Sequence, residues 1–320
     1  MADITPPHKR THRFGLIGAA FGLGFIIGPV IGGELGEFGP RVPFFAAAGL
    51  AFANFLFGLL VLPESLPKSN RRKFSIRRAN PLGAVMALRQ YSSVLWLLVV
   101  LFFLQLATQA LPTIFSYFTV EVFEFSSSTI GRTLGAFGIG FAFSQAVLAG
   151  PLSKGMGEPI VGVIGLLAAA IAFAGIAFSA DVYQLYLFIA VGCVSGLAPP
   201  AINGVLSRQV PDNSQGELQG AVNAASSLAT IIGPLGATQI FSYYTSSPTS
   251  GHYFPGAPFI ACGIAVALAL IVFAAAAWRF ELGRRPSVAD HPHAPEMPPP
   301  GQLRVAPLED DDDVENSPRH

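Results

Sequence analysis

Long apolar runs alternate along the chain with short polar or glycine-rich segments. Each run has about the 20 residues that a membrane-spanning helix needs. None of them alternates between apolar and polar residues, and each is about twice the length of a barrel strand. The pattern predicts an all-α integral membrane protein with eight spans, at Phe14–Gly33, Phe44–Leu62, Val94–Thr119, Thr133–Leu152, Pro159–Ala180, Val182–Ser207, Leu218–Ser242 and Phe254–Trp278.

The charge distribution supports spans rather than a water-soluble surface. Charged residues are 12% of the chain and apolar residues 52%, whereas a soluble domain is about 25% charged. No Asp, Glu, Lys or Arg lies between Arg89 and Glu121, or between Glu217 and Arg279. A charge at the bilayer centre costs roughly 2.5–3.5 kcal/mol on insertion scales. The lipid bilayer is therefore a predicted partner, and the zero formal net charge predicts no nucleic-acid partner.

Lysine and arginine positions predict the orientation of the spans. If the N-terminus is inside, all but two of the 19 basic residues, Arg41 and Arg132, fall on the inner side. Basic residues concentrate in cytoplasmic loops, so both termini are predicted to be cytoplasmic. From Gly283 onward the chain is rich in proline and ends near the acidic run 309–313, which predicts a disordered tail.

A glycine-proline pattern occurs in both the first and the seventh span. Gly28-Pro29 and Gly233-Pro234 are offset by 205 residues, and six spans fit into one such period. The chain thus has the pattern of a repeat of six-helix units. Eight spans are two plus six, so we expect that the first four helices of the first unit are missing ahead of Met1.

Two motifs resemble those of a known transporter family. The pattern Gly24, Gly28, Pro29, Gly32, Gly33 in the first span resembles the antiporter motif of the major facilitator superfamily. The segment that contains Gly150, Lys154, Gly157 and Glu158 is similar to the short cytoplasmic turn that is the superfamily's other signature. Short ordered matches at 2–5, 12–16, 206–210 and 215–220 resemble the tetracycline-resistance exporter group of drug:proton antiporters.

The resemblance implies a partial major facilitator fold with 8 of the 12 helices. Residues 1–62 would be the last two helices of the N-terminal bundle and 63–92 a basic cytoplasmic loop between bundles. Residues 93–282 would form the complete C-terminal six-helix bundle, and 283–320 the disordered tail. The missing N-terminal half is then a candidate partner.

The glycine motif and the cytoplasmic turn each have a physical role on this interpretation. Gly24, Gly28 and Gly32 share one helix face, which lets another helix approach closely, and generic close packing is the alternative explanation of the spacing. Pro29 removes a backbone donor and bends the helix. In the family the turn acts as a gate that charge pairs clamp. Because Met156 stands where a second basic residue would be expected near Lys154, we predict a weakened or absent clamp.

Polar side chains within the spans are the candidate substrate contacts, because such groups are costly in hydrocarbon when unpaired. Each of them could instead bond neighbouring helices together. Aromatic side chains at helical spacing could line a pocket for an amphipathic drug, or they could instead face lipid or pack in the core. The pocket candidates are Gln105, Gln109, Phe141, Gln145 and Asn203.

The sequence departs from the exporter pattern at two positions. The resemblance implies a histidine four residues before Gln145 and an aspartate in the fifth span, but this chain has Phe141 and Ala169. No ionisable residue remains at mid-depth in any span. This argues against tetracycline as the substrate and against proton antiport by this chain alone.

The predicted function is transport rather than catalysis. Serine, histidine and carboxylate side chains do not cluster at one depth and no metal-ligand spacing occurs, so an enzyme is not predicted. The resemblance implies export of a small amphipathic substrate from the bacterial inner membrane by proton antiport with alternating access, with the proton gradient as energy source and no cofactor. The alternative is a non-transporting remnant, or a half-transporter subunit that needs a partner.

Overall fold

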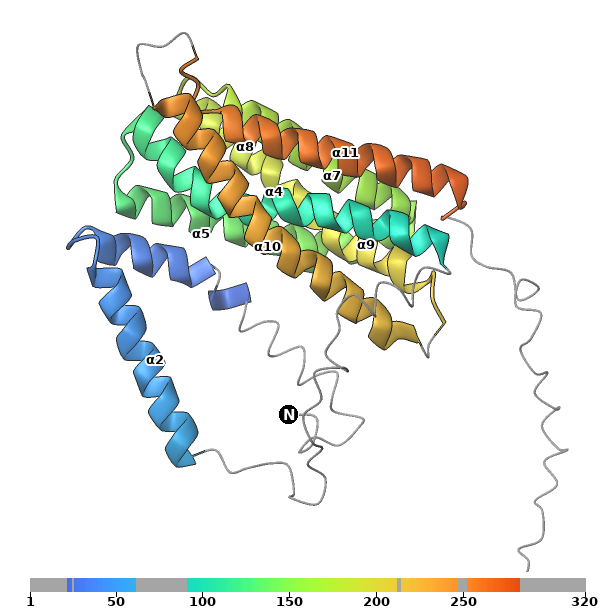
Figure 1. Ribbon diagram of the computed structural model, residues 1–320, viewed down its shortest axis with the longest axis horizontal. Coiled ribbons are helices and arrows are strands. Elements are labelled where there is room, and N and C mark those ends of the chain that lie inside the picture. Colours follow the sequence, from blue (N-terminus) through green and yellow to red (C-terminus); the bar gives the residue numbers. More distant parts are fainter. Residues whose placement is uncertain (1–21, 25, 62–90, 212–213, 247–251, 283–320) are drawn as a thin grey trace, which may run out of the picture. The chain divides into compact units, whose positions relative to one another are not determined.

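The computed structural model describes residues 22–24, 26–61, 91–211, 214–246 and 252–282. Seven helical segments in this part are long and apolar enough to cross a membrane, and a shorter apolar helix covers Gly22–Gly36. The seven are α2 (Val42–Val61), α4 (Ser92–Phe123), the segment Ser127–Met156, α7 (Glu158–Ala177), the segment Val182–Ser207, α10 (Gln215–Thr245) and α11 (Ala257–Arg279). The predicted all-α membrane fold is confirmed (Figure 1).

Seven of the eight predicted spans coincide with these segments. Most helices continue a few residues past the apolar run at one or both ends, as in Ser92–Phe123 against the predicted Val94–Thr119. Part of the predicted first span lies outside the described residues, as do nearly all of the basic loop 63–92 and the tail 283–320.

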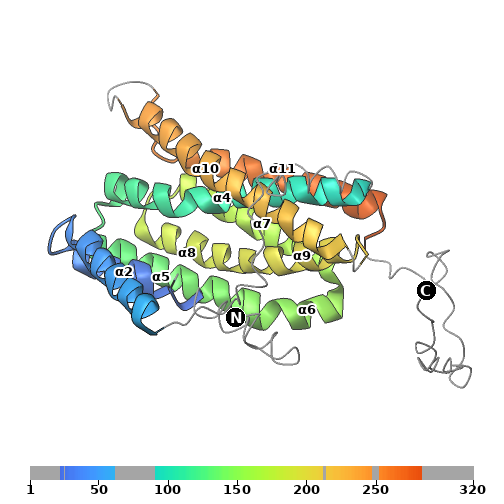
Figure 2. The same ribbon diagram turned by 60° about the horizontal axis from the view of Figure 1, so that its bottom comes forward.

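Two of the spans are broken partway along their length. The segment Ser127–Met156 consists of α5 (Ser127–Phe143), a π-helical turn η5 (Ser144–Leu148) and α6 (Ala149–Met156). The segment Val182–Ser207 consists of α8 (Val182–Cys193), a 3-10 turn η6 (Val194–Leu197) and α9 (Ala198–Ser207). Figure 2 shows α5 and α6 roughly in line, and likewise α8 and α9.

The two breaks face each other. A side chain at Gly196 in η6 would meet the main-chain carbonyl of Phe141 and would lie 3.2 Å from Cβ of Ser144. Single π-helical turns inside α-helices occur often at functional sites. Apolar periodicity carries no signal for such a turn, and neither break was predicted.

The core lies between α4, α7 and α11. Phe118, Phe259 and Phe273 are almost completely buried there, and the rings of Phe118 and Phe259 meet edge to face with centroids 5.0 Å apart. In lipid, close packing rather than exclusion of water drives such contacts. By contrast, α2 has no buried residue, which suits an apolar helix in a bilayer.

Short polar signals set the helix ends. Ser126 caps α5 by accepting a hydrogen bond from the Thr129 main-chain N–H, and the Asp181 carboxylate accepts two from the start of α8. Only Gly157, with φ of 88°, separates α6 from α7. The connection is therefore shorter than the gap between the predicted spans Thr133–Leu152 and Pro159–Ala180, because α6 continues to Met156.

Candidate substrate cavity

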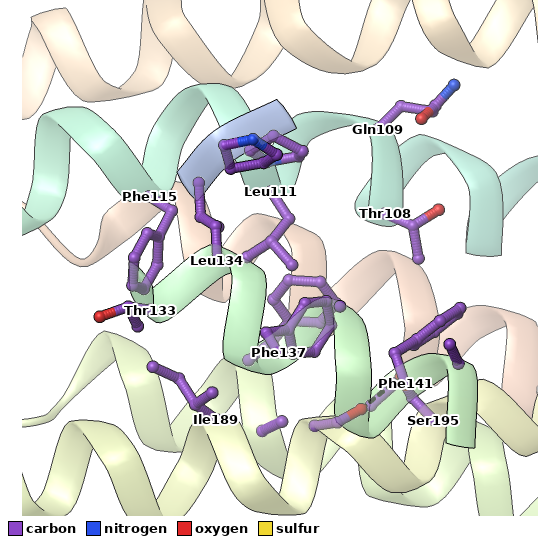
Figure 3. Close-up of a pocket in the computed structure, with 18 of the residues that line it drawn as sticks. Thr108, Gln109, Leu111, Phe115, Thr133, Leu134, Phe137, Phe141, Ile189 and Ser195 are labelled. Atoms are coloured by element: carbon purple, nitrogen blue, oxygen red, sulfur yellow. Dashed lines mark hydrogen bonds between the residues drawn. The ribbon is translucent and has the colours of Figure 1, made fainter. Parts of the chain in front are cut away.

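A cavity of about 460 Å³ lies between the helix Gly22–Gly36 and the helices α4, α5, α7 and α8, with η5 and η6 also on its wall. Figure 3 shows side chains from several of these elements converging on it. The elements come from distant parts of the sequence, so the cavity exists only in the folded bundle. Six polar side chains line it: Gln105, Thr108, Gln109, Thr133, Gln145 and Ser195.

The structure brings four of the five predicted pocket residues to this one cavity. Gln105, Gln109, Phe141 and Gln145 all line it. Asn203 does not: it is exposed on α9, between buried Ile202 and Val205. The apolar face of α9 turns inward and carries Asn203 outward, a difference that the polar residue type alone could not reveal. A substrate-binding role for the four stays a prediction.

Two of the cavity amides also bond to a neighbouring helix. The Gln105 amide nitrogen donates to the Ser226 hydroxyl at 3.3 Å, and that of Gln109 donates to the Thr230 hydroxyl at 2.7 Å. Both acceptors lie on α10. The two alternatives for these glutamines, cavity contact and bonding between helices, thus hold at the same time.

Three hydroxyls on the cavity wall were not predicted. Thr108, Thr133 and Ser195 each donate to a main-chain carbonyl of their own helix, at 3.0, 2.8 and 2.6 Å. Such internal bonds allow a hydroxyl to be buried in an apolar helix at little cost. Serine and threonine are common within spans for this reason, so their type alone carries no signal for a cavity.

The antiporter motif contacts α5, but through a face other than the one predicted. Gly33 is buried, and a side chain there would lie 2.9 Å from the Cα atom of Gly131. A side chain at Gly131 would in turn meet the Pro29 carbonyl oxygen. In contrast, Gly24, Gly28 and Gly32 have no neighbouring atom within 4 Å of an added Cβ. None of the helices that the structure describes therefore occupies their shared face, and a close helix approach there stays a prediction.

An ion pair lies at one end of the contact between the helix Gly22–Gly36 and α5. Arg132 Nε lies 2.7 Å from Glu34 Oε1, which also accepts from the Ser128 hydroxyl at 2.9 Å. The Ser128 main-chain N–H donates to Glu37 Oε1 at 2.8 Å. This bond, followed by one from the Ser126 side chain, lowers the pKa of the Glu37 carboxyl below its ordinary value. The basic-residue counts predict that this end is the outer one.

The turn between α6 and α7, at the end of the helices opposite to this ion pair, carries a second charge pair that was not predicted from the sequence. Glu158 Oε1 lies 2.6 Å from Arg208 Nη2, across the ends of α7 and α9. Lys154 is exposed and pairs with no acidic residue in the described part of the chain, and Gly150 has open space around it. A weakened or absent clamp was predicted from Lys154 and Met156. That prediction included Glu158 in the turn but overlooked Arg208, its partner 50 residues away.

Comparisons with known proteins agree with this architecture. The profile of the Major Facilitator Superfamily matches residues 1–234 and 123–307. The chain belongs to the Major Facilitator Superfamily. It is 36% identical over 247 residues to the class C tetracycline resistance protein of Escherichia coli (77% of this chain, 62% of that protein), and 34% identical over 276 residues to the class E protein of Escherichia coli (85% and 66%).

Solved structures of the superfamily resemble the chain as well. The human organic anion transporter MFSD10 superposes with a TM-score of 0.58 at 26% identity, covering 85% of this chain and 65% of that one. A bacterial homologue of the lysosomal transporter Spinster gives a TM-score of 0.63 at 14% identity, covering 89% and 74%. The chain spans about three fifths to two thirds of the length of the curated relatives that it matches. These relatives are transporters and not enzymes.

Within this superfamily member, both departures from the exporter pattern fall on the cavity wall. Phe141 and Ala169, which stand where the resemblance implies a histidine and an aspartate, both line the cavity. None of its described lining residues carries a charged side chain. The substitutions therefore change the chemistry of the cavity itself rather than that of a lipid-facing surface.

Proposed function

We propose that this superfamily member exports small amphipathic molecules across the bacterial inner membrane, using the proton gradient and alternating access of one cavity to the two sides. No cofactor is part of the proposal. Both termini are placed in the cytoplasm, because this orientation leaves only Arg41 and Arg132 outside. The similarity to tetracycline resistance proteins supports drug export.

The observation that carries the proposal is the composition of the cavity. Its volume of about 460 Å³ falls within the usual range of small-molecule sites, about 300–1,000 Å³. Its wall combines aromatic rings with a few amides and hydroxyls, the lining that suits a molecule with an apolar body and some polar groups. With Phe141 and Ala169 in place of ionisable residues, we propose a substrate other than tetracycline.

Reconstitution tests the proposal directly. The full chain is placed in proteoliposomes, and efflux of cationic and anionic fluorescent amphipathic dyes is followed with and without a pH gradient. We expect gradient-dependent efflux of at least one dye. Replacing Gln145→Ala should lower it about tenfold, because one hydrogen bond to substrate is worth about 1 kcal/mol or somewhat more.

Asn203→Ala is the matched control, since Asn203 is also a polar span residue but lies away from the cavity. It should leave the rate within about twofold of the unchanged protein. Equal losses of efflux rate from the two substitutions would show that this cavity is not the substrate site. Absence of any gradient-dependent efflux would contradict proton-driven transport by this chain alone.

The half-transporter alternative rests on a separate observation. The face that carries Gly24 and Gly28 is exposed and has no neighbour in the described part of the chain. A small-residue face of this kind is suited to another membrane helix, and an N-terminal half supplied by a second chain is the proposed partner. Co-expression with the first four helices of the class C relative tests it: efflux that appears only on co-expression, together with co-purification, favours the two-part transporter.

A further inference from the structure

A backbone seam between the helix Gly22–Gly36 and α5 runs from the cavity to the end of the molecule that is predicted to be the outer one. Pro29 lines the cavity, and a side chain at Gly131 would meet its carbonyl oxygen. Further out, a side chain at Gly36 would lie 2.9 Å from Cβ of Ser127. Between these two helices, the path from the cavity to the outer surface is therefore closed.

A carboxylate just beyond the first helix caps the start of α5. Glu37 Oε1 accepts a hydrogen bond from the Ser128 main-chain N–H at 2.8 Å, and the Ser126 side chain is also bonded to this carboxylate. The Ser128 N–H is one of the first four of the helix, which have no acceptor within it. Glu37 thus supplies that acceptor from another part of the chain, and the positive end of the α5 dipole favours its negative charge.

An ion pair lies beside this cap, one residue triplet earlier on the first helix. Glu34 Oε1 lies 2.7 Å from Arg132 Nε and accepts from the Ser128 hydroxyl at 2.9 Å. The charged groups that act on Glu37 are Arg132 of α5 and Glu34 itself. Protonation of the carboxylates would remove their attraction to Arg132 and weaken the charge-assisted hydrogen bonds. The polar end of the seam therefore depends on both carboxylates being ionised.

We propose that Glu34 and Glu37 form a charge-held latch at the outer end of the cavity, which acid on the outer side releases. While both carboxylates are ionised, the latch keeps the helix Gly22–Gly36 on α5. Once they are protonated, only the glycine contacts of the seam remain, and the two helices separate more readily. The inference rests on the proposed function, of which it names a point of regulation.

The direction of the pH response follows from the contacts of Glu37. The hydrogen bond from Ser128 is the largest cause that lowers the pKa of its carboxyl below the ordinary value. A carboxyl with a lowered pKa in the latched state stabilises that state at neutral pH, and this contribution disappears as the pH falls through the lowered pKa. The latch therefore holds at neutral pH and opens in an acidic medium.

The distance between two spin labels tests the latch. The labels replace Phe38, next to the latch, and Tyr183, at the start of α8, whose side chains are 80% and 87% exposed. The full chain, with its two cysteines replaced by alanine, is reconstituted in proteoliposomes. Pulsed electron paramagnetic resonance then gives the distribution of distances, without substrate and without a gradient.

The double variant Glu34→Gln with Glu37→Gln imitates the protonated pair. At neutral pH it should raise the ratio of longer to shorter distances about threefold or more, because several charge-assisted bonds at an exposed site are weakened together. In the unchanged protein the same ratio should rise as the pH falls through the lowered pKa of Glu37, whereas the double variant should not respond.

Glu121→Gln is the matched control. Its carboxylate, at the end of α4, accepts a hydrogen bond from the Tyr253 hydroxyl at 2.7 Å but takes no part in the seam, so the distances should not change. A charge swap separates the ion pair from any effect on folding: Glu34→Arg alone should lengthen the distance, and adding Arg132→Glu should restore it.

Distances in the double variant that equal those of the unchanged protein at neutral pH would refute the latch. An equal rise in the Glu121 control, or an acid response that persists in the double variant, would also refute it. Acid-induced separation in a chain that moves no dye would contradict the proposed function and leave the latch standing. Gradient-dependent efflux with distances that respond to neither acid nor substitution would do the reverse.

Discussion

The two glycine-proline copies of this chain make different helix contacts. In the helix Gly22–Gly36, Gly28 faces open space, and it is the Pro29 carbonyl that approaches α5 at Gly131. In α10, the corresponding Gly233 is buried, and a side chain there would lie 2.6 Å from the Leu106 carbonyl oxygen of α4. Identical dipeptides 205 residues apart thus use different atoms to bring a backbone close.

The two helix contacts also differ in where their polar side chains lie. The α4–α10 contact carries the amide–hydroxyl pairs behind the cavity. The contact of Gly22–Gly36 with α5 has its polar groups at one end, in the pair of Glu34 with Arg132. Where the first copy has Gly33 against Gly131, the aligned residue of α10 is Thr238. The first contact is therefore a close backbone crossing and the second a polar scaffold.

The largest expected effect is on the backbone crossing. Gly131→Ala places a methyl group against the Pro29 carbonyl, and relieving such overlap typically costs about 1–3 kcal/mol. Gly28→Ala, in the same motif but in open space, should change the stability by no more than about 0.5 kcal/mol. Denaturant unfolding of both variants in micelles, followed by circular dichroism, measures the difference.

The outcome that would break the comparison is a Gly28→Ala variant as unstable as Gly131→Ala. The open face would then be covered in solution, for example by a second copy of the chain. Gly233→Ala tests the second glycine-proline copy. We expect it to lower the free energy of unfolding about as much as Gly131→Ala, because the Leu106 carbonyl belongs to helix backbone and cannot rotate away.

A smaller effect is expected for the polar scaffold. A double-mutant cycle with Gln109→Leu and Thr230→Val isolates the bond between the two side chains. Interhelical hydrogen bonds in membrane proteins average about 0.6 kcal/mol, with a maximum of about 1.7 kcal/mol, and the short distance of 2.7 Å favours the upper half of that range. Unfolding free energies of the four proteins give the coupling. A coupling of zero would mean that the amide is not held by Thr230.

Apolar length was sufficient to predict the spans but not their internal breaks. The predicted Val182–Ser207 coincides with the observed span, because a continuous apolar run dictates a helix in lipid. The same run contains η6, which depends on the close fit of Gly196 against the Phe141 carbonyl. Such a contact joins residues 55 positions apart in the chain, and no local pattern encodes it.

The residues of the cavity were also predicted only in part. Gln105 and Gln145 were predicted because a polar side chain within a span is costly in hydrocarbon and is therefore often functional. Phe141 was predicted because it is an aromatic residue within a span. The type of residue does not say which face it occupies, so Asn203 was included wrongly as a neighbour of the other four. The pair of Glu158 with Arg208 was missed because each residue alone reads as an ordinary helix-end charge.

The smallest effect concerns the polar end of the backbone crossing and depends on pH. The hydrogen bond from the Ser128 main-chain N–H lowers the pKa of the Glu37 carboxyl in the folded protein. A carboxyl with a lowered folded pKa stabilises the fold above its unfolded value, about 4.3, and that contribution disappears as the pH falls through the folded pKa.

Thermal unfolding of the unchanged protein and of Glu37→Gln should therefore differ most near neutral pH and converge as the pH falls through the lowered folded pKa of Glu37. The difference will be small, because Glu37 is exposed. Glu124→Gln is the control: Glu124 is also an exposed carboxylate near the start of α5, but it accepts no hydrogen bond from a described residue. If its unfolding curve followed the same pH dependence as that of Glu37→Gln, the effect would come from the net charge of this end, and the bond to Ser128 would have no part in holding Gly22–Gly36 against α5.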